Sequence, residues 1–146
     1  MSFPPEILAK TLQELEKGEW DDPVPEWNLV ARCYAAARVP LKDLSVENLR
    51  LLIGQTCSLD YLVPLAIDRL TEEPWASGDY YDGDLLQNVL SVPPGFWSSH
   101  PDLDVRMDGV VRKALDIVHA ADSGDADWLF ERRVLDVLEK WVERSR

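Results

Sequence analysis

Six apolar side chains between positions 59 and 70 recur every three or four residues, and this spacing places them on one face of a single α-helix. They are Leu59, Leu62, Val63, Ala66, Ile67 and Leu70. A helix with such a stripe is stable only when the stripe is buried against neighbouring elements. Pro64 lies within the segment and predicts a kink or a limit to its first turns. Because no segment shows the alternation typical of a strand, the period predicts an all-α protein.

The same period recurs along most of the chain. Helices are expected over residues 5–17, 26–38, 45–54, 58–73, 84–91, 102–121 and 126–144, with Phe96 and Trp97 on one further turn before Pro101. Short links join these segments, so we expect one all-α domain over residues 1–146, an orthogonal bundle of six to seven helices.

Several residues mark the ends of these helices. Ser45, Ser58 and Asp84 each precede an apolar-periodic segment and are expected to be N-caps, because their side chains can accept a hydrogen bond from a free backbone N–H. Gly18 and Gly54 follow the ends of two segments and are expected to stop them.

Composition limits the classes of function. The 146 residues carry a net charge of −12, which argues against binding to nucleic acid or to an anionic membrane. No apolar run approaches the roughly 20 residues of a membrane span, and the first residues do not resemble a signal peptide. We therefore expect a cytoplasmic protein with no membrane contact, in which Cys33 and Cys57 are free thiols.

One segment concentrates negative charge and aromatic rings. Between Arg69 and Arg106 the chain has no lysine and no arginine. Within it lies what we call the acidic loop, residues 72–84. Because complementary charge steers association and aromatic side chains act as anchors, this loop is a candidate surface for a basic partner. Its candidate binding residues are Glu72, Glu73, Trp75, Asp79, Tyr80, Tyr81, Asp82 and Asp84. The alternative is a polar link between helices whose tyrosines pack locally.

A second acidic segment lies nearer the N-terminus. No lysine or arginine occurs between Lys17 and Arg32, and two tryptophans accompany the carboxylates there. The residues concerned are Glu19, Trp20, Asp21, Asp22, Glu26 and Trp27. Each tryptophan could equally be a core residue, because large aromatic side chains mostly serve the core.

The chain carries no recognisable catalytic or metal-binding motif. P-loop, G-x-G-x-x-G and G-x-S-x-G sequences are absent. Asp116 and His119 share a helix face but form only one Asp-x-x-His unit, whereas a carboxylate-bridged metal site in a bundle needs more ligands. The aspartates of the acidic loop do not follow the EF-hand spacing. We therefore expect no catalytic residue, no metal site and no cofactor.

Four stretches of the chain resemble the immunity proteins of bacterial contact-dependent growth inhibition systems. Together they span residues 11–103. They are Thr11 to Glu16 followed by Trp20 and Pro23, the run Pro40 to Gln55, the run Leu59 to Ala66, and Gly78 to Leu86 followed by Val89, Leu90 and Pro93 to Trp97.

The resemblance implies a cytoplasmic, non-enzymatic protein that binds and neutralises the toxin domain delivered by a neighbouring cell. By analogy the toxin is basic, and many such toxins are nucleases. A tight complex would then use Trp75 or Tyr81 as a desolvated anchor surrounded by carboxylates. Two alternatives stay open, a helical adaptor or regulatory module with another basic partner, and an enzyme.

Overall fold

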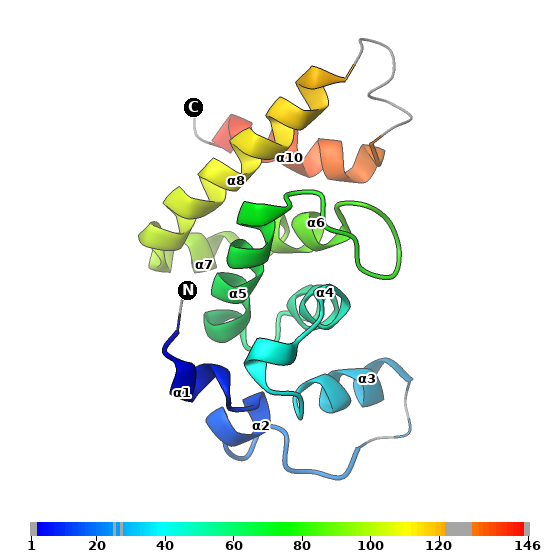
Figure 1. The fold of residues 1–146 in the computed structure, drawn as a ribbon, viewed down its shortest axis with the longest axis vertical. Helices are drawn as coiled ribbons and strands as arrows, with labels where there is room; N and C mark the ends of the chain where they lie inside the picture. Colours follow the sequence, from blue (N-terminus) through cyan, green and yellow to red (C-terminus); the bar gives the residue numbers. More distant parts are fainter. Residues whose placement is uncertain (1–2, 25, 27, 122–129, 145–146) are drawn as a thin grey trace.

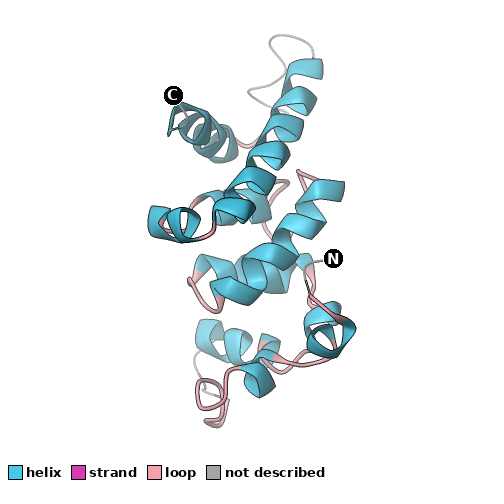
Figure 2. Ribbon diagram, turned by 90° about the vertical axis from the view of Figure 1, so that its left-hand side faces the viewer, coloured by secondary structure: helices cyan, strands magenta, loops and turns pink. Residues whose placement is uncertain are grey.

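The computed structural model describes residues 3–24, 26, 28–121 and 130–144, and every regular element within them is a helix (Figures 1 and 2). The prediction of an all-α bundle is therefore confirmed. The elements are α1 Pro5–Leu8, α2 Leu12–Leu15, α3 Asn28–Ala36, η1 Leu41–Asp43 (a 3₁₀ helix), α4 Val46–Gly54, α5 Leu59–Glu72, α6 Asp84–Leu90, α7 Pro94–Ser99, α8 Pro101–Ala120 and α10 Arg132–Arg144.

Helix α5 lies at the centre of the molecule and packs against α4, α6 and α8 (Figure 1). Its predicted stripe is confirmed, because all but one of the six side chains are completely buried and Leu59 is half-buried. The helix continues through Pro64 to Glu72, so the proline does not end it. Helices α1 to α3 lie at one end of α5 and α10 lies at the other, while α8 runs alongside α5 (Figure 1).

The hydrophobic core runs from the first helix to the last. It includes Leu8 of α1, Trp20, Met107 of α8, and Leu138 and Trp141 of α10, all buried. Helix α10 packs on α6 and α8, so the C-terminal segment covers the same core as the middle of the chain.

The expected N-cap at Ser45 is confirmed. Its hydroxyl accepts a hydrogen bond from the Asn48 N–H at 3.0 Å, and the Asn48 side chain accepts one from the Ser45 N–H at 3.0 Å. Ser58 occupies the expected N-cap position of α5, but its side chain makes no capping hydrogen bond. Its backbone is left-handed, with φ of 53°, and its hydroxyl donates to the Glu16 carboxylate instead.

Gly54 is the last residue of α4 and not a left-handed stop. A Cβ at this position would lie 2.8 Å from Nδ2 of Asn88, which donates to the carbonyl of Arg50. Glycine at position 54 thus leaves room for the Asn88 side chain of α6. The left-handed conformations fall on Thr56 and Ser58, whereas Gly18 has the expected positive φ of 94°.

The single helix expected over residues 5–17 is wrong, because the chain breaks between α1 and α2. Thr11 and Glu14 form a capping box that starts α2. The Lys10 carbonyl accepts a hydrogen bond from the Leu41 N–H at 2.9 Å, and the Gln13 N–H donates to Ala37. Backbone pairing with a distant segment thus replaces the hydrogen bonds of a continuous helix.

The remaining helix predictions hold with shifted ends. Helix α6 occupies Asp84–Leu90 within the expected 84–91, and α8 begins one residue earlier than expected, at Pro101. Helix α3 starts at Asn28, and α10 starts at Arg132. The expected start of α3, residue 26, lies between residues 25 and 27, and the expected start of α10, residue 126, lies within residues 122–129. Residues 25, 27 and 122–129 lie outside the described residues.

Candidate functional site

The buried side chain of Asp84 holds the acidic loop in place by hydrogen bonds to its backbone. Its side chain is only 2% exposed, and its carboxylate accepts hydrogen bonds from the N–H groups of Gly78 at 2.6 Å and Tyr80 at 3.1 Å. The N-cap of α6 is Gly83, so the expected cap at Asp84 is wrong by one residue. The carboxylate turns back to the loop because the loop's N–H groups need an acceptor away from water.

Glu47 fastens the same loop from α4, and sequence reasoning placed it only in a helix first turn. Its carboxylate accepts a hydrogen bond from the Asp79 N–H at 2.9 Å, two from Arg50 at 2.6 Å, and one from Arg32 at 2.8 Å. The hydrogen bonds from Arg50, above all, lower the pKa of Glu47 to about 2.

Gly78 is needed where these two carboxylates meet. A Cβ there would lie 2.6 Å from Oε1 of Glu47 and 2.9 Å from Oδ2 of Asp84. A side chain at this position would displace these two carboxylates or the loop backbone that they hold. The glycine was visible in the sequence, but its two neighbours lie in other elements, so the spacing along the chain gave no sign of this contact.

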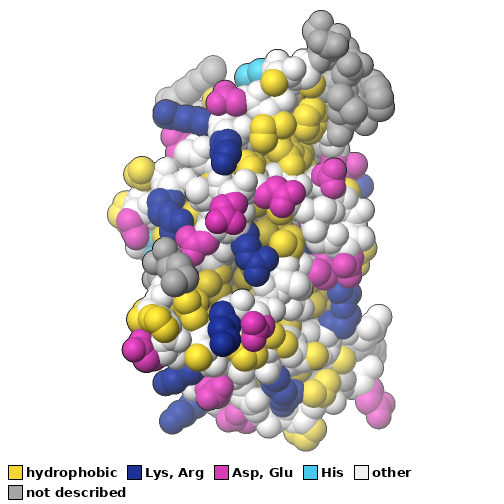
Figure 3. Space-filling view, in the orientation of Figure 1, with side chains coloured by type: hydrophobic (Ala, Val, Ile, Leu, Met, Phe, Trp, Pro, Cys, Tyr) yellow, Lys and Arg dark blue, Asp and Glu magenta, His cyan; other side chains and the backbone are white. Residues whose placement is uncertain are grey.

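Arginines from distant segments accompany the acidic loop. The Arg32 guanidinium lies 3.6 Å from the Asp79 carboxylate. Arg50 lies over the Tyr80 ring, with Cζ 4.4 Å from the centroid, and Arg133 lies 4.8 Å from the Tyr81 centroid. The charged residues of the loop are therefore all acidic along the chain, but in the folded protein arginines from other segments lie beside them. Likewise, Figure 3 shows acidic and basic side chains interspersed over the face it draws.

The aromatic side chains of the acidic loop take different positions. Trp75 is half-buried, packs 4.8 Å from the Phe130 ring and donates its Nε1–H to the Ala114 carbonyl at 3.2 Å. Tyr81 is also half-buried, and its hydroxyl hydrogen-bonds Gln87. Tyr80, in contrast, is 65% exposed. The most exposed aromatic ring of the acidic loop is thus that of Tyr80.

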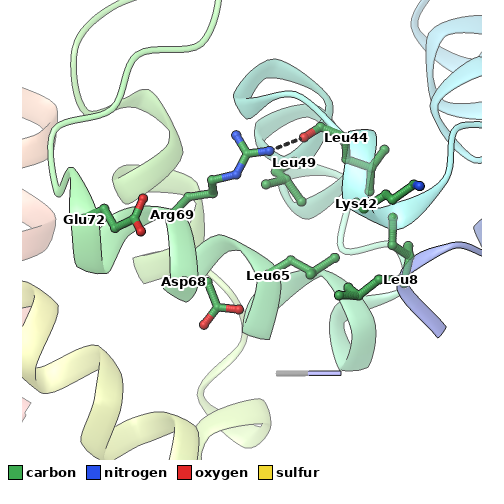
Figure 4. A pocket seen from close by; sticks show the side chains of 9 residues that line it. Leu8, Lys42, Leu44, Leu49, Leu65, Asp68, Arg69 and Glu72 are labelled. Carbon is green, nitrogen blue, oxygen red and sulfur yellow. Dashed lines mark hydrogen bonds between the residues drawn. The ribbon is translucent and has the colours of Figure 1, made fainter. Parts of the chain in front are cut away.

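The candidate carboxylates divide into two groups. Asp79 and Asp82 are exposed near Tyr80, and Glu73 is exposed at the end of α5. Glu72 is also exposed, but it lines a groove of about 240 Å³ that is bounded by α5 residues Leu65, Asp68 and Arg69. Figure 4 shows it beside Arg69, which donates a hydrogen bond to the Leu44 carbonyl at 2.7 Å.

This groove has apolar walls and a rim of both charges. Leu8, Leu44, Leu49 and Leu65 converge on it in Figure 4, and Lys42, Asp68, Arg69 and Glu72 surround it. Asp68 pairs with Arg106 at 2.7 Å. Because its rim is mixed in sign, the groove does not favour a partner of one charge.

The second acidic segment folds around Trp20, which is buried with 8% exposure. Its ring packs edge-on against Tyr34, with centroids 5.2 Å apart. Arg38 donates from Nη2 to the carbonyls of Trp20 and Asp22. Trp27 lies outside the described residues.

Neither a metal cluster nor a membrane span occurs in the part of the chain that the structure describes. No three His, Cys, Asp or Glu side chains there gather in a way that could hold a metal ion. None of the described helices has the length and apolarity needed to cross a bilayer. Cys33 and Cys57 are free thiols, and burial raises the pKa of both.

Comparison with known proteins identifies one family. The family model described as CDI immunity proteins matches residues 14–107, nearly two thirds of the chain. The match covers α3 to α7, the acidic loop and the first turns of α8. Neither a curated protein nor a solved structure matches the chain.

Proposed function

The chain belongs to the family of CDI immunity proteins, and we propose that it binds and neutralises the cognate toxin domain of a contact-dependent growth inhibition system through the acidic loop. The observation that carries this proposal is the fixed loop backbone. It is held by two internal carboxylates while Asp79, Tyr80 and Asp82 face solvent.

A loop fixed in this way is suited to tight binding. A flexible loop loses conformational entropy when a partner orders it, whereas a fixed loop has already lost it during folding. Asp84 and Glu47 hold four consecutive N–H groups, those of Gly78 to Tyr81. The partner would therefore meet a surface whose shape is already set.

The charge of the chain supports a basic partner. With a net charge of −12, the protein attracts cationic surfaces at long range, and this raises the rate of encounter. At the loop itself, Asp79 and Asp82 would provide local complementarity and Tyr80 a rigid contact. A toxin that binds nucleic acid would carry such a basic surface.

The eight residues predicted from the sequence receive different roles in this proposal. Asp79, Tyr80, Asp82 and the accessible part of Tyr81 would contact the toxin. Trp75 and Asp84 would position the loop, because their polar atoms are already used inside the protein. Glu72 and Glu73 would contribute to the field at its margin.

The test is a binding measurement with the purified cognate toxin domain. Asp79→Lys combined with Asp82→Lys should slow association roughly tenfold at low salt, and the difference should shrink as salt screens the charges. Tyr80→Ala should instead accelerate dissociation roughly 30-fold, as expected for an interface anchor worth about 2 kcal/mol.

Glu143→Lys is the matched control. Glu143 is exposed near the far end of α10, away from Arg133 and the loop, so its reversal should leave association nearly unchanged. Thermal melts of all variants check the fold, because exposed charges contribute little to stability. Parent-like binding and protection by all the loop variants would show that the acidic loop is only structural.

A further inference from the structure

A pocket separate from the acidic loop lies at the other end of α4. Glu47, which holds the loop, is in the first turn of α4, whereas the pocket is lined by Thr56, Cys57 and Ser58, just past its last residue. Its volume is about 470 Å³, and its other walls come from Glu16, Glu19, Trp20 and Tyr34. We call it the aromatic–carboxylate pocket.

The Glu16 carboxylate is fixed in the wall of this pocket. The same oxygen, Oε1, accepts a hydrogen bond from the Trp20 Nε1–H at 3.0 Å and a second hydrogen bond from the Ser58 hydroxyl. Both donors are neutral, so they orient the carboxylate without cancelling its charge. Glu16 is half-buried, and a partly desolvated charge interacts more strongly with an incoming cation than an exposed one.

No cation of the described chain satisfies this carboxylate. Neither Glu16 nor Glu19 forms an ion pair with any lysine or arginine of residues 3–24, 26, 28–121 and 130–144. Arg38 directs its Nη2 to the carbonyls of Trp20 and Asp22, and its Cζ lies 5.9 Å from the centroid of the Tyr34 ring, but it pairs with neither glutamate. Because burial raises the pKa of Cys57, the thiol in the wall stays neutral, and the negative charge comes from the two glutamates.

Aromatic rings complete the pocket. Trp20 and Tyr34 meet edge to face, with centroids 5.2 Å apart, and both line the cavity. Aromatic rings attract cations through their quadrupole and also pack against the methylene groups of lysine or arginine. The pocket thus combines the fixed Glu16 carboxylate, the Glu19 carboxylate and an aromatic wall. This combination is complementary to a long side chain that ends in a positive charge.

We propose that the aromatic–carboxylate pocket receives a lysine or arginine side chain of the toxin domain, as a second contact point beside the acidic loop. The identity of the partner rests on the proposed function, but the preference of the pocket for a cation does not. The pocket would give the complex an anchor that is independent of the loop.

The first experiment measures the cation preference without any toxin. Nα-acetyl-lysine amide and Nα-acetyl-arginine amide are titrated into the protein while the Trp20 indole N–H signal is followed by NMR. Saturable shifts with a Kd on the order of millimolar are expected, because so small a ligand cannot bind tightly. The neutral Nα,Nε-diacetyl-lysine amide should cause no saturable shift. Equal shifts from the neutral and charged compounds, or none from either, would overturn the proposal.

Glu16→Gln removes the charge and keeps an oxygen that can accept from Trp20 and Ser58. It should weaken binding of both cationic amides at least roughly tenfold, while Glu143→Gln leaves binding unchanged. If Glu16→Gln fails to fold, as a thermal melt would show, Glu19→Gln provides the same test, since Glu19 is exposed and its side chain has no described partner. Unchanged amide binding in the folded variant would overturn the pocket.

The second experiment identifies the source of the cation. Glu16→Gln should accelerate dissociation of the toxin domain at least roughly tenfold, with Glu143→Gln again unchanged. If Glu16→Gln no longer binds the amides but releases the toxin domain at the parent's rate, the pocket does not receive a toxin side chain. A parent protein that binds the amides but no toxin would instead refute the proposed function and leave the cation preference standing.

Discussion

Glu47 shows how one residue can serve a helix and a distant loop together. In the first turn of α4 a carboxylate is favoured by the helix dipole, and this much follows from the sequence. Its bond to Arg50, three residues further along the same helix, also follows from spacing, because side chains three apart on a helix meet. Its bonds to Asp79 and Arg32 follow only from the fold, because those residues lie on other segments, and spacing along the chain could not predict them.

The lowered pKa of Glu47 predicts a pH dependence. Its pKa is about 2 in the folded protein and 4.5 ordinarily, so its ionised form stabilises the fold above about pH 4.5, and this contribution is lost as pH falls towards 2. At pH 7, Glu47→Gln should lower the free energy of unfolding by on the order of 2–3 kcal/mol. The difference from the parent should shrink between about pH 4.5 and 2, as measured by urea unfolding.

Glu143→Gln provides the comparison for this series, since it removes one exposed carboxylate elsewhere. Its difference from the parent should stay within about 0.5 kcal/mol at every pH. A Glu47→Gln difference that does not change with pH would show that the carboxylate is not held by these arginines.

At the scale of elements, the sequence predicted the features that depend only on residues close together in the chain. The stripe of α5, the cap of α4 at Ser45 and the start of α6 near Asp84 were recoverable, because each depends on neighbours within a few residues. The break between α1 and α2 was not, because it depends on backbone pairing with Ala37 and Leu41. The same limit applies to Trp75, which turns inward to meet α8 and Phe130.

Helix α5 gives the clearest test at this scale. Leu62 is completely buried, so Leu62→Ala should lower the free energy of unfolding by roughly 2–5 kcal/mol through lost burial and the cavity left behind. Val105→Ala on α8 should cost less than about 0.5 kcal/mol, because Val105 is 73% exposed. Denaturant unfolding of both variants measures the contrast, and similar small losses would mean that the register of α5 is wrong.

At the scale of the molecule, the C-terminal helix extends the protein beyond the family match, which ends at residue 107. Helix α10 nevertheless buries Val134, Leu138 and Trp141 in the same core. It also reaches the acidic loop, where Arg133 covers Tyr81 and Val134 lies against Gly83. The structure thus shows that α10 completes the core and supports the acidic loop, whereas the sequence predicted only that this segment is helical.

This arrangement predicts that the chain unfolds as one unit, in keeping with the single domain expected over residues 1–146. Leu138→Ala should cost roughly 2–5 kcal/mol, because Leu138 is completely buried. Tryptophan fluorescence and far-UV circular dichroism should report coincident transitions for the variant and the parent. Separate transitions for the two signals would divide the C-terminal segment from the rest.

The bonds that hold the acidic loop have a consequence for how such a protein can change over generations. Asp84 and Glu47 accept hydrogen bonds from backbone N–H groups of the loop. Every amino acid except proline has a backbone N–H group. The exposed side chains at positions 79, 80 and 82 can therefore be exchanged while the loop keeps its shape. Under the function proposed above, a lineage of these proteins could follow a diversifying toxin by substitution at the loop tip, without losing the stability of the fold.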